Sequence, residues 1–180
     1  MIVRYGRVLL LSIFFLTSGL ADGEEYDIDT IKAVFLERFT RFIKWPEEVL
    51  NDKGPFVIAI AGQTPVEKKL KEVYRTRKIL GLEVEIINIE EDPIPKCHIL
   101  FIGELSEGEL GRLLAASTGR PVLTVSDTRG FAQKGVRINF FSMDSRLRFE
   151  INESSIRSSG LNVSYLLLKQ AKIIKAEKEP

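Results

Sequence analysis

Apolar residues recur every three or four positions near the start of the chain, which predicts an amphipathic helix. The pattern runs from Ile28 to Ile43, with Asp27 or Asp29 available as the N-cap, and Pro46 ends it. The apolar positions are Ile28, Ile31, Val34, Phe35, Phe39, Phe42 and Ile43.

Continuous apolar runs predict strands that are buried on both faces, at residues 56–61, 98–102 and 121–125. Residues 82–89 alternate apolar with acidic positions and predict an exposed edge strand. Between them, Thr64-Pro65 predicts a helix to about Tyr74, and Ser106 caps another that reaches about Ala116.

A late antiparallel hairpin is predicted by two stretches of period-2 alternation, at residues 136–141 and 146–152. The polar connection 142–145 is long enough only to reverse the chain. The chain then closes with predicted helical segments on either side of Gly160 and a disordered tail, 175–180. Alternating strands and helices favour an α/β three-layer sandwich, Rossmann-like, with a mainly parallel sheet plus this hairpin.

The first 21 residues have the features of a secretory signal peptide. Arg4 and Arg7 precede the apolar run 8–16, and Gly19-Leu20-Ala21 offers small residues for cleavage before Asp22. The alternative is an uncleaved membrane anchor, but this run is about half of the ~20 residues that span a bilayer. We expect the mature protein, residues 22–180, to be exported, soluble and a single domain.

Composition excludes several classes of function. The chain has 180 residues, 44% of them hydrophobic, and removal of Arg4 and Arg7 leaves 24 basic against 25 acidic residues, a net charge of −1. That charge indicates neither nucleic-acid binding nor a polybasic membrane patch. Cys97 is the only cysteine, so no intrachain disulfide forms, and its place at the head of an apolar run favours a buried, inert thiol.

Nothing in the sequence supports catalysis, a metal site or a cofactor. His98 is the only histidine, and side chains of neighbouring strand residues point to opposite faces, which separates it from Cys97. The sequence contains no P-loop, G-x-S-x-G or G-x-G-x-x-G motif.

Three polar residues follow predicted parallel strands, where α/β sheets bind ligands. They are Thr64, Glu104 and Asp127. Thr64 is equally explained as a helix cap, and Asp127 as an Asx-turn that ends its strand. In the hairpin, Asn139, Arg148 and Glu150 are further candidates for small-molecule binding, although cross-strand pairing explains them without a ligand.

The first predicted helix and its exit carry more aromatic area than one helix face usually requires. Core packing is the favoured account of this stripe. Surplus aromatic surface would instead mark an interface, which makes Phe39, Phe42 and Trp45, with Arg148 of the hairpin, candidate partner-binding residues.

Several blocks in order resemble the YfiR-like family of bacterial periplasmic proteins, over about residues 28–174. The blocks are LERFTRFIKWPEE (36–48), CHILFIGE (97–104), GRPVLTVSD (119–127) and SDTRGFAQKGVRINFFSMDSRLRFEIN (126–152). Some members of that family use cysteine pairs, and the single Cys97 departs from that pattern.

The resemblance implies a non-enzymatic regulator that binds and represses the periplasmic part of an inner-membrane signalling protein. The implied partner is a diguanylate cyclase, which makes cyclic di-GMP, or a sensor kinase, with an outer-membrane lipoprotein as a further partner. A homodimer is also expected by analogy. Two alternatives remain open: a small-molecule binding or sensor module at the strand ends, and an envelope hydrolase with an unrecognised site.

Overall fold

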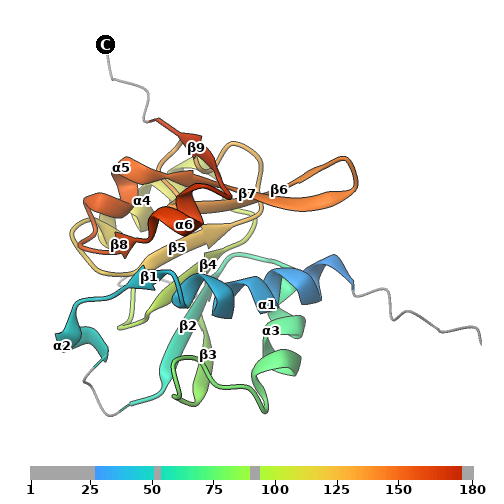
Figure 1. Cartoon of the computed structure of the whole chain (residues 1–180), viewed down its shortest axis with the longest axis vertical. Helices are drawn as coiled ribbons and strands as arrows, with labels where there is room; N and C mark the ends of the chain where they lie inside the picture. Colours follow the sequence, from blue (N-terminus) through green and yellow to red (C-terminus); the bar gives the residue numbers. More distant parts are fainter. Residues whose placement is uncertain (1–26, 51–53, 90–93, 176–180) are drawn as a thin grey trace, which may run out of the picture.

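A seven-stranded sheet lies at the centre of the computed structural model, which describes residues 27–50, 54–89 and 94–175 (Figure 1). The strand order is β3-β2-β4-β5-β6-β7-β9. Strands β2 to β6 are mutually parallel, β7 is antiparallel to β6, and β9 runs parallel to β7. The strands are β2 (Phe56–Ala61), β3 (Val84–Ile89), β4 (Ile99–Ile102), β5 (Leu123–Ser126), β6 (Ile138–Met143), β7 (Arg146–Asn152) and β9 (Lys172–Ile174).

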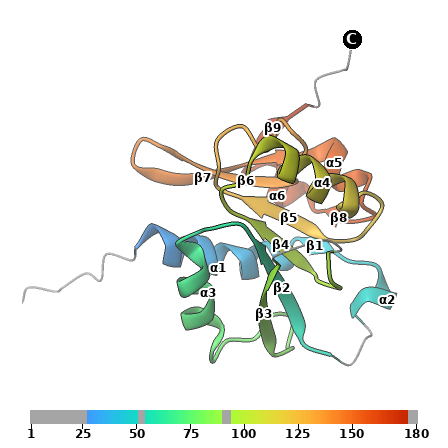
Figure 2. The same ribbon diagram turned by 180° about the vertical axis from the view of Figure 1, so that it is seen from behind.

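Helices cover both faces of this sheet and complete the predicted three-layer α/β sandwich. They are α1 (Ile28–Thr40), α2 (Glu47–Leu50), α3 (Val66–Tyr74), α4 (Glu107–Ser117), α5 (Glu153–Arg157) and α6 (Tyr165–Leu168). Helices α1 and α3 share a core with one face, whereas α4 packs on the other (Figure 2). The predicted fold class is therefore confirmed.

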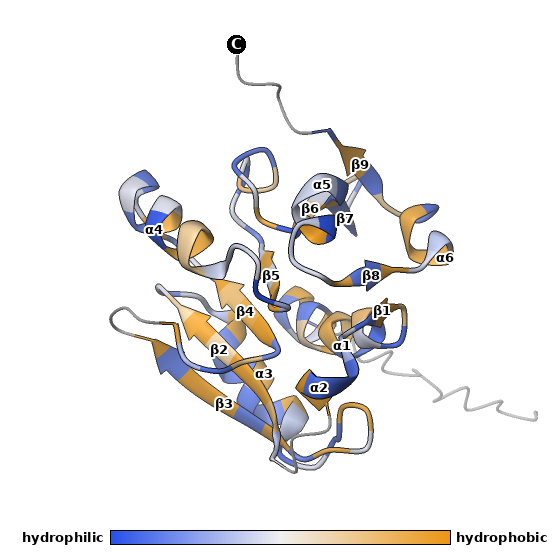
Figure 3. Ribbon diagram, turned by 90° about the vertical axis from the view of Figure 1, so that its left-hand side faces the viewer, coloured by the Kyte–Doolittle hydropathy of each residue, from blue (hydrophilic) through white to orange (hydrophobic). Residues whose placement is uncertain are grey.

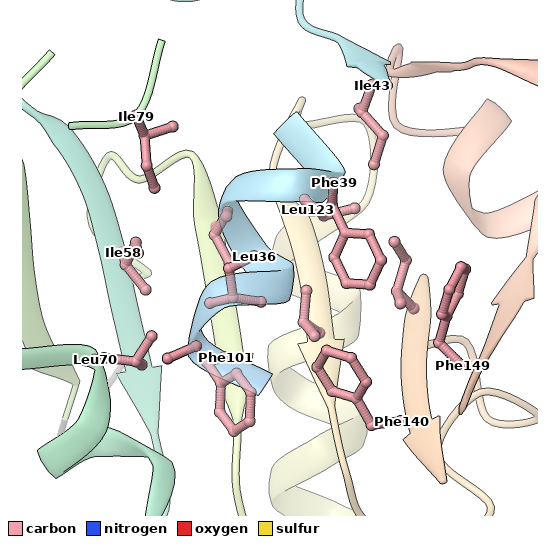
Figure 4. Packing of buried hydrophobic residues seen from close by; sticks show 14 of the residues in the cluster. Leu36, Phe39, Ile43, Ile58, Leu70, Ile79, Phe101, Leu123, Phe140 and Phe149 are labelled. Atoms are coloured by element: carbon pink, nitrogen blue, oxygen red, sulfur yellow. The ribbon is translucent and has the colours of Figure 1, made fainter. Parts of the chain in front are cut away.

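Helix α1 packs three buried side chains, Ala33, Leu36 and Phe39, into the first core. The Asp27 carboxylate accepts a hydrogen bond from the Asp29 backbone N–H and caps the helix, as the sequence predicts. Phe39 lies fully buried with its ring centroid 5.6 Å from that of Phe140 and 5.1 Å from that of Phe149 (Figure 4). This aromatic cluster joins α1 to the hairpin.

The buried strands β2 and β4 are continuous apolar segments, whereas β3 alternates because it forms an edge of the sheet (Figure 3). Strand β5 is buried at all four positions, although Thr124 and Ser126 are polar. Helix α4 begins with a capping box in which Ser106 and Glu109 bond to each other's backbone N–H groups. These elements lie where the sequence predicts them.

The first helix is shorter than predicted. It ends at Thr40, and Ile43–Lys44 forms strand β1, which pairs antiparallel with β8 (Asn162–Val163) in a separate two-stranded sheet. Ile43 and Trp45 are still buried, Trp45 edge-on to Phe56. The spacing of Ile43 was interpreted as helical, but Ile43 lies in β1, and both residues belong to the first core.

The end of the chain also differs from the prediction. Helix α5 lies before Gly160 as expected, but the segment after Gly160 forms β8, the four-residue α6 and strand β9. Ile151 of β7 pairs with Ile173 of β9, so this apolar run contributes backbone bonds to the sheet. The predicted signal peptide (1–21) and residues 176–180 of the predicted tail lie outside the described residues.

The hairpin of β6 and β7 has a tighter turn than the four-residue connection predicted. Only Asp144 and Ser145 lie between the strands, with φ values of 51° and 57°. Two successive positive φ values characterise the type I′ turn that suits strand twist. The hairpin projects beyond the body of the molecule (Figures 1 and 2).

Candidate functional site

A pocket of about 700 Å³ lies at the carboxyl ends of the parallel strands, and we call it the strand-end pocket. It brings together the three residues predicted for this place, Thr64, Glu104 and Asp127. Its lining is Gln63, Thr64, Pro65, Glu104, Asp127, Thr128 and Arg129. Helices α3 and α4 leave β2 and β4 toward opposite faces, so the pocket lies at a topological switch point.

Close approach of two loops positions Glu104 beside Thr64. The Glu104 N–H donates to the Gln63 carbonyl over 3.0 Å. Gly62 has φ +75°, and a Cβ there would lie 2.6 Å from the Glu104 carbonyl oxygen. Glycine is therefore required for the loops to meet. The Thr64 hydroxyl accepts from the Val66 N–H at the start of α3, so its capping role is present in the structure.

The Asp127 carboxylate is held by a lysine from α1. Lys32 Nζ lies 2.6 Å from Asp127 Oδ2 and 2.7 Å from Asp29 Oδ1. The turn after β5 is closed by Ser126 Oγ, which accepts from the Thr128 N–H. Asp127 thus ties the pocket to α1, and Ser126 makes the side-chain bond that ends the strand.

Lys32 was not predicted from the sequence. The feature of the sequence that could have identified Lys32 is its position. It lies four residues from both Ile28 and Leu36, within the apolar stripe of α1. Burial acts to lower the pKa of Lys32, but hydrogen bonds to Asp127 and Asp29 outweigh it and raise the pKa above its ordinary value. The ammonium therefore remains charged between its two carboxylates.

A second pocket of about 630 Å³, the hairpin pocket, adjoins the first and shares Asp127 and Arg129 with it. Its lining is Asp127, Arg129, Gly130, Gln133, Asn139, Phe140, Phe141, Ser142, Glu150 and Lys172. Asn139 and Glu150 face each other across the two strands. Arg148 pairs across the hairpin with Phe141, is exposed, and lines neither pocket.

The aromatic residues predicted for partner binding are mostly internal. Phe39 and Trp45 are buried in the first core, in agreement with the core-packing account, while Phe42 is half-buried. Their role in partner binding stays a prediction. Of the four candidates for that role, Phe42 and Arg148 have surface available.

Cys97 and His98 are both buried in the interior of the protein. Burial raises the pKa of the Cys97 thiol to about 11, which suppresses the reactive thiolate. His98 accepts a hydrogen bond at Nδ1 from the Val57 N–H and stacks on Phe56 with ring centroids 4.4 Å apart. Across the described residues, no cluster of three His, Cys, Asp or Glu side chains could hold a metal ion.

Two neighbouring apolar side chains of α6 are strongly exposed, which the sequence interpretation missed. Tyr165 is 67% and Leu166 60% exposed. The Ser164 N–H donates to the Phe42 carbonyl over 2.8 Å, which brings the start of α6 beside Phe42. We call Phe42, Tyr165 and Leu166 the α6 surface.

Comparison with known proteins identifies one family. The sequence pattern described as YfiR/HmsC-like matches residues 29–172. That match spans from the first turn of α1 to the first residue of β9. No curated protein matches the chain significantly. Among the described residues, no helix has the length and apolar character needed to cross a membrane.

Proposed function

The chain belongs to the YfiR/HmsC-like family of periplasmic regulators of signalling, and on that ground we propose that it binds and represses the periplasmic part of an inner-membrane signalling protein. The observation that carries this proposal is the extent of the family match, residues 29–172. The match includes the sheet up to the first residue of β9, α1 from its second residue and the residues that line both pockets, so the proposal concerns the whole domain.

The proposed partner is a diguanylate cyclase, with a sensor kinase as the other member of the same class. Repression works by stoichiometric binding, without turnover. The regulator must bind the inactive state of its partner more tightly than the active state, because equal affinities shift no equilibrium. An outer-membrane lipoprotein that sequesters the regulator would release the partner.

The α6 surface is the part of the described chain that we assign to partner contact. Large apolar side chains that are exposed side by side are unusual on a surface without a binding role. Tyrosine is enriched at the centres of protein interfaces, where a few residues carry most of the affinity. Phe42, predicted from the sequence as a partner-binding residue, lies at the edge of this surface.

Replacing both Tyr165 and Leu166 with serine is expected to abolish repression while the protein stays folded. Both side chains are exposed, so their removal costs little stability, about 0.5 kcal/mol or less each. Loss of two central interface residues costs about 2 kcal/mol or more each in binding. Cyclic di-GMP in cells carrying the double variant should match the level in cells that lack the gene.

Met143→Ser is the matched control, because Met143 is 50% exposed but lies at the far end of the hairpin. It should leave cyclic di-GMP at the level of the unaltered protein. If the α6 double variant and Met143→Ser change cyclic di-GMP equally, the assignment of the α6 surface to partner contact is contradicted. If deletion of the gene leaves cyclic di-GMP unchanged, a cyclase partner is contradicted.

A second candidate function is a small-molecule sensor, favoured by the convergence of Thr64, Glu104 and Asp127 on the strand-end pocket. A ligand held there should raise the melting temperature of the purified protein. Asp127→Ala should remove that increase, but it also breaks the ion pair with Lys32. Glu104→Ala is therefore the cleaner companion variant, and persistence of the increase in both would contradict the assignment.

A further inference from the structure

Two asparagines are buried on the same face of the hairpin sheet, and only one of them is satisfied. Asn152 donates to the Ala132 carbonyl and accepts at Oδ1 from Ser154 Oγ and the Ser155 N–H. Asn139 is 1% exposed and donates to the Phe140 carbonyl over 3.2 Å. Within residues 27–50, 54–89 and 94–175, its Oδ1 has no hydrogen-bond partner.

A buried acceptor without a hydrogen-bond partner lowers the stability of the fold. Buried polar groups are nearly always hydrogen-bonded, because leaving water without a replacement partner is unfavourable. A side chain of similar shape without polar atoms, such as leucine, would avoid that cost at position 139. The unsatisfied acceptor therefore points to a donor from outside the described residues.

Asn139 belongs to the lining of the hairpin pocket, and its neighbours define what can enter. Glu150, directly across the strands, is 5% exposed and forms an ion pair with Lys172 over 3.3 Å. The Lys172 side chain is 60% exposed, so an entering group can displace it. Displacement of Lys172 frees the Glu150 carboxylate from its ion pair.

The charges around the hairpin pocket balance. Its acidic side chains are those of Asp127 and Glu150, and its basic side chains are those of Arg129 and Lys172. A lining with balanced charges favours a ligand that carries no net charge. It offers both donors and acceptors, which suits hydroxyl groups because each can donate and accept.

We propose that the hairpin pocket binds a small neutral ligand with adjacent hydroxyl groups, of monosaccharide size, and that one hydroxyl donates to Asn139 Oδ1. The volume of about 630 Å³ lies within the usual range for small-molecule sites. Phe141 adds an aromatic side chain to the lining, against which the apolar face of a sugar ring can lie. Glu150 accepts from a second hydroxyl.

This site goes beyond the two functions proposed above, since it requires neither a protein partner nor the strand-end pocket. Thr64 and Glu104 line only the strand-end pocket, whereas Asn139 and Glu150 line only the hairpin pocket. Variants of Glu104 and Asn139 therefore distinguish failure of one assignment from failure of the other.

The test is saturation-transfer NMR of the purified protein with glucose, galactose, mannose and N-acetylglucosamine, each at millimolar concentration. At least one sugar should bind, and Asn139→Leu should weaken its binding at least about tenfold. The same variant should melt at a higher temperature than the unaltered protein, because it removes an unsatisfied acceptor. Asn152→Leu, which breaks satisfied bonds in an equally buried position, should melt at a lower temperature.

Glu104→Ala should leave sugar binding unchanged. The proposal is overturned if none of the four sugars binds, if Asn139→Leu retains full binding, or if Asn139→Leu lowers the melting temperature as Asn152→Leu does. Binding of sulfate in place of the sugars would overturn the neutral class of ligand.

Discussion

Phe39→Ala is expected to destabilise the fold by about 3–5 kcal/mol, the usual cost of deleting a buried phenylalanine. The ring of Phe39 is stacked with Phe140 and edge-on to Phe149, so its loss opens a cavity between α1 and the hairpin. Chemical denaturation followed by circular dichroism measures the change in the free energy of unfolding.

Phe42→Ala is the matched control, since Phe42 lies just after the same helix but is only half-buried. We expect a change of about 1 kcal/mol for it. Similar losses in the two variants would contradict the assignment of Phe39 to the core. A loss of signalling in Phe39→Ala would report unfolding, so Phe42 is the informative aromatic residue for partner binding.

Arg137→Met is expected to destabilise the fold by about 3 kcal/mol, because it leaves several buried carbonyls without donors. The Arg137 guanidinium is buried and donates to the carbonyls of Ser117, Val122 and Ser155. It thereby joins the end of α4, the start of β5 and α5. Burial lowers the pKa of Arg137 to about 10, and relief of that cost in the variant offsets part of the loss.

Arg148→Met provides the comparison within the hairpin, because Arg148 is exposed. Its unfolding free energy should stay within about 0.5 kcal/mol of the unaltered protein. Equal stability of Arg137→Met and Arg148→Met would mean that the bonds made by Arg137 contribute nothing net. Urea unfolding of the two variants side by side decides between these results.

The sequence predicted correctly the elements whose patterns involve only residues close together in the chain. Strand β2 and the capped helix α4 follow from a bounded apolar run and from the Ser106–Glu109 spacing. The hairpin follows from period-2 alternation and the short polar connection between the two stretches. In each case, burial and capping favour the same structure, so neighbours far along the chain were not needed.

Predictions were wrong where pairing with a distant segment decides the structure. Ile43 continues the spacing of α1, but it pairs with Val163 across more than a hundred residues of chain. Ile173 follows a leucine-rich helical pattern, yet β7 offers it an edge to pair with. Periodicity cannot distinguish a short apolar strand from a helical segment in such places.

The sequence predicted only the part of the candidate site that lies at the carboxyl ends of the strands. Parallel strands bring their carboxyl ends to one edge, which placed Thr64, Glu104 and Asp127 together. The role of Lys32 was not predicted, because its contact with Asp127 depends on how α1 crosses the sheet. The exposure of Tyr165 and Leu166 was not predicted, because the segment after Gly160 was interpreted as helical and forms β8, the four-residue α6 and β9 instead.

The most direct test of repression by binding is site-specific photocrosslinking in living cells. A photoreactive amino acid at position 165 should capture an inner-membrane signalling protein in the periplasm, whereas the same group at position 143 should not. Deleting the gene should then change the product of that partner, cyclic di-GMP for a cyclase. Capture of only a second copy of this chain, or of nothing, with cyclic di-GMP unchanged on deletion, would contradict the regulator account.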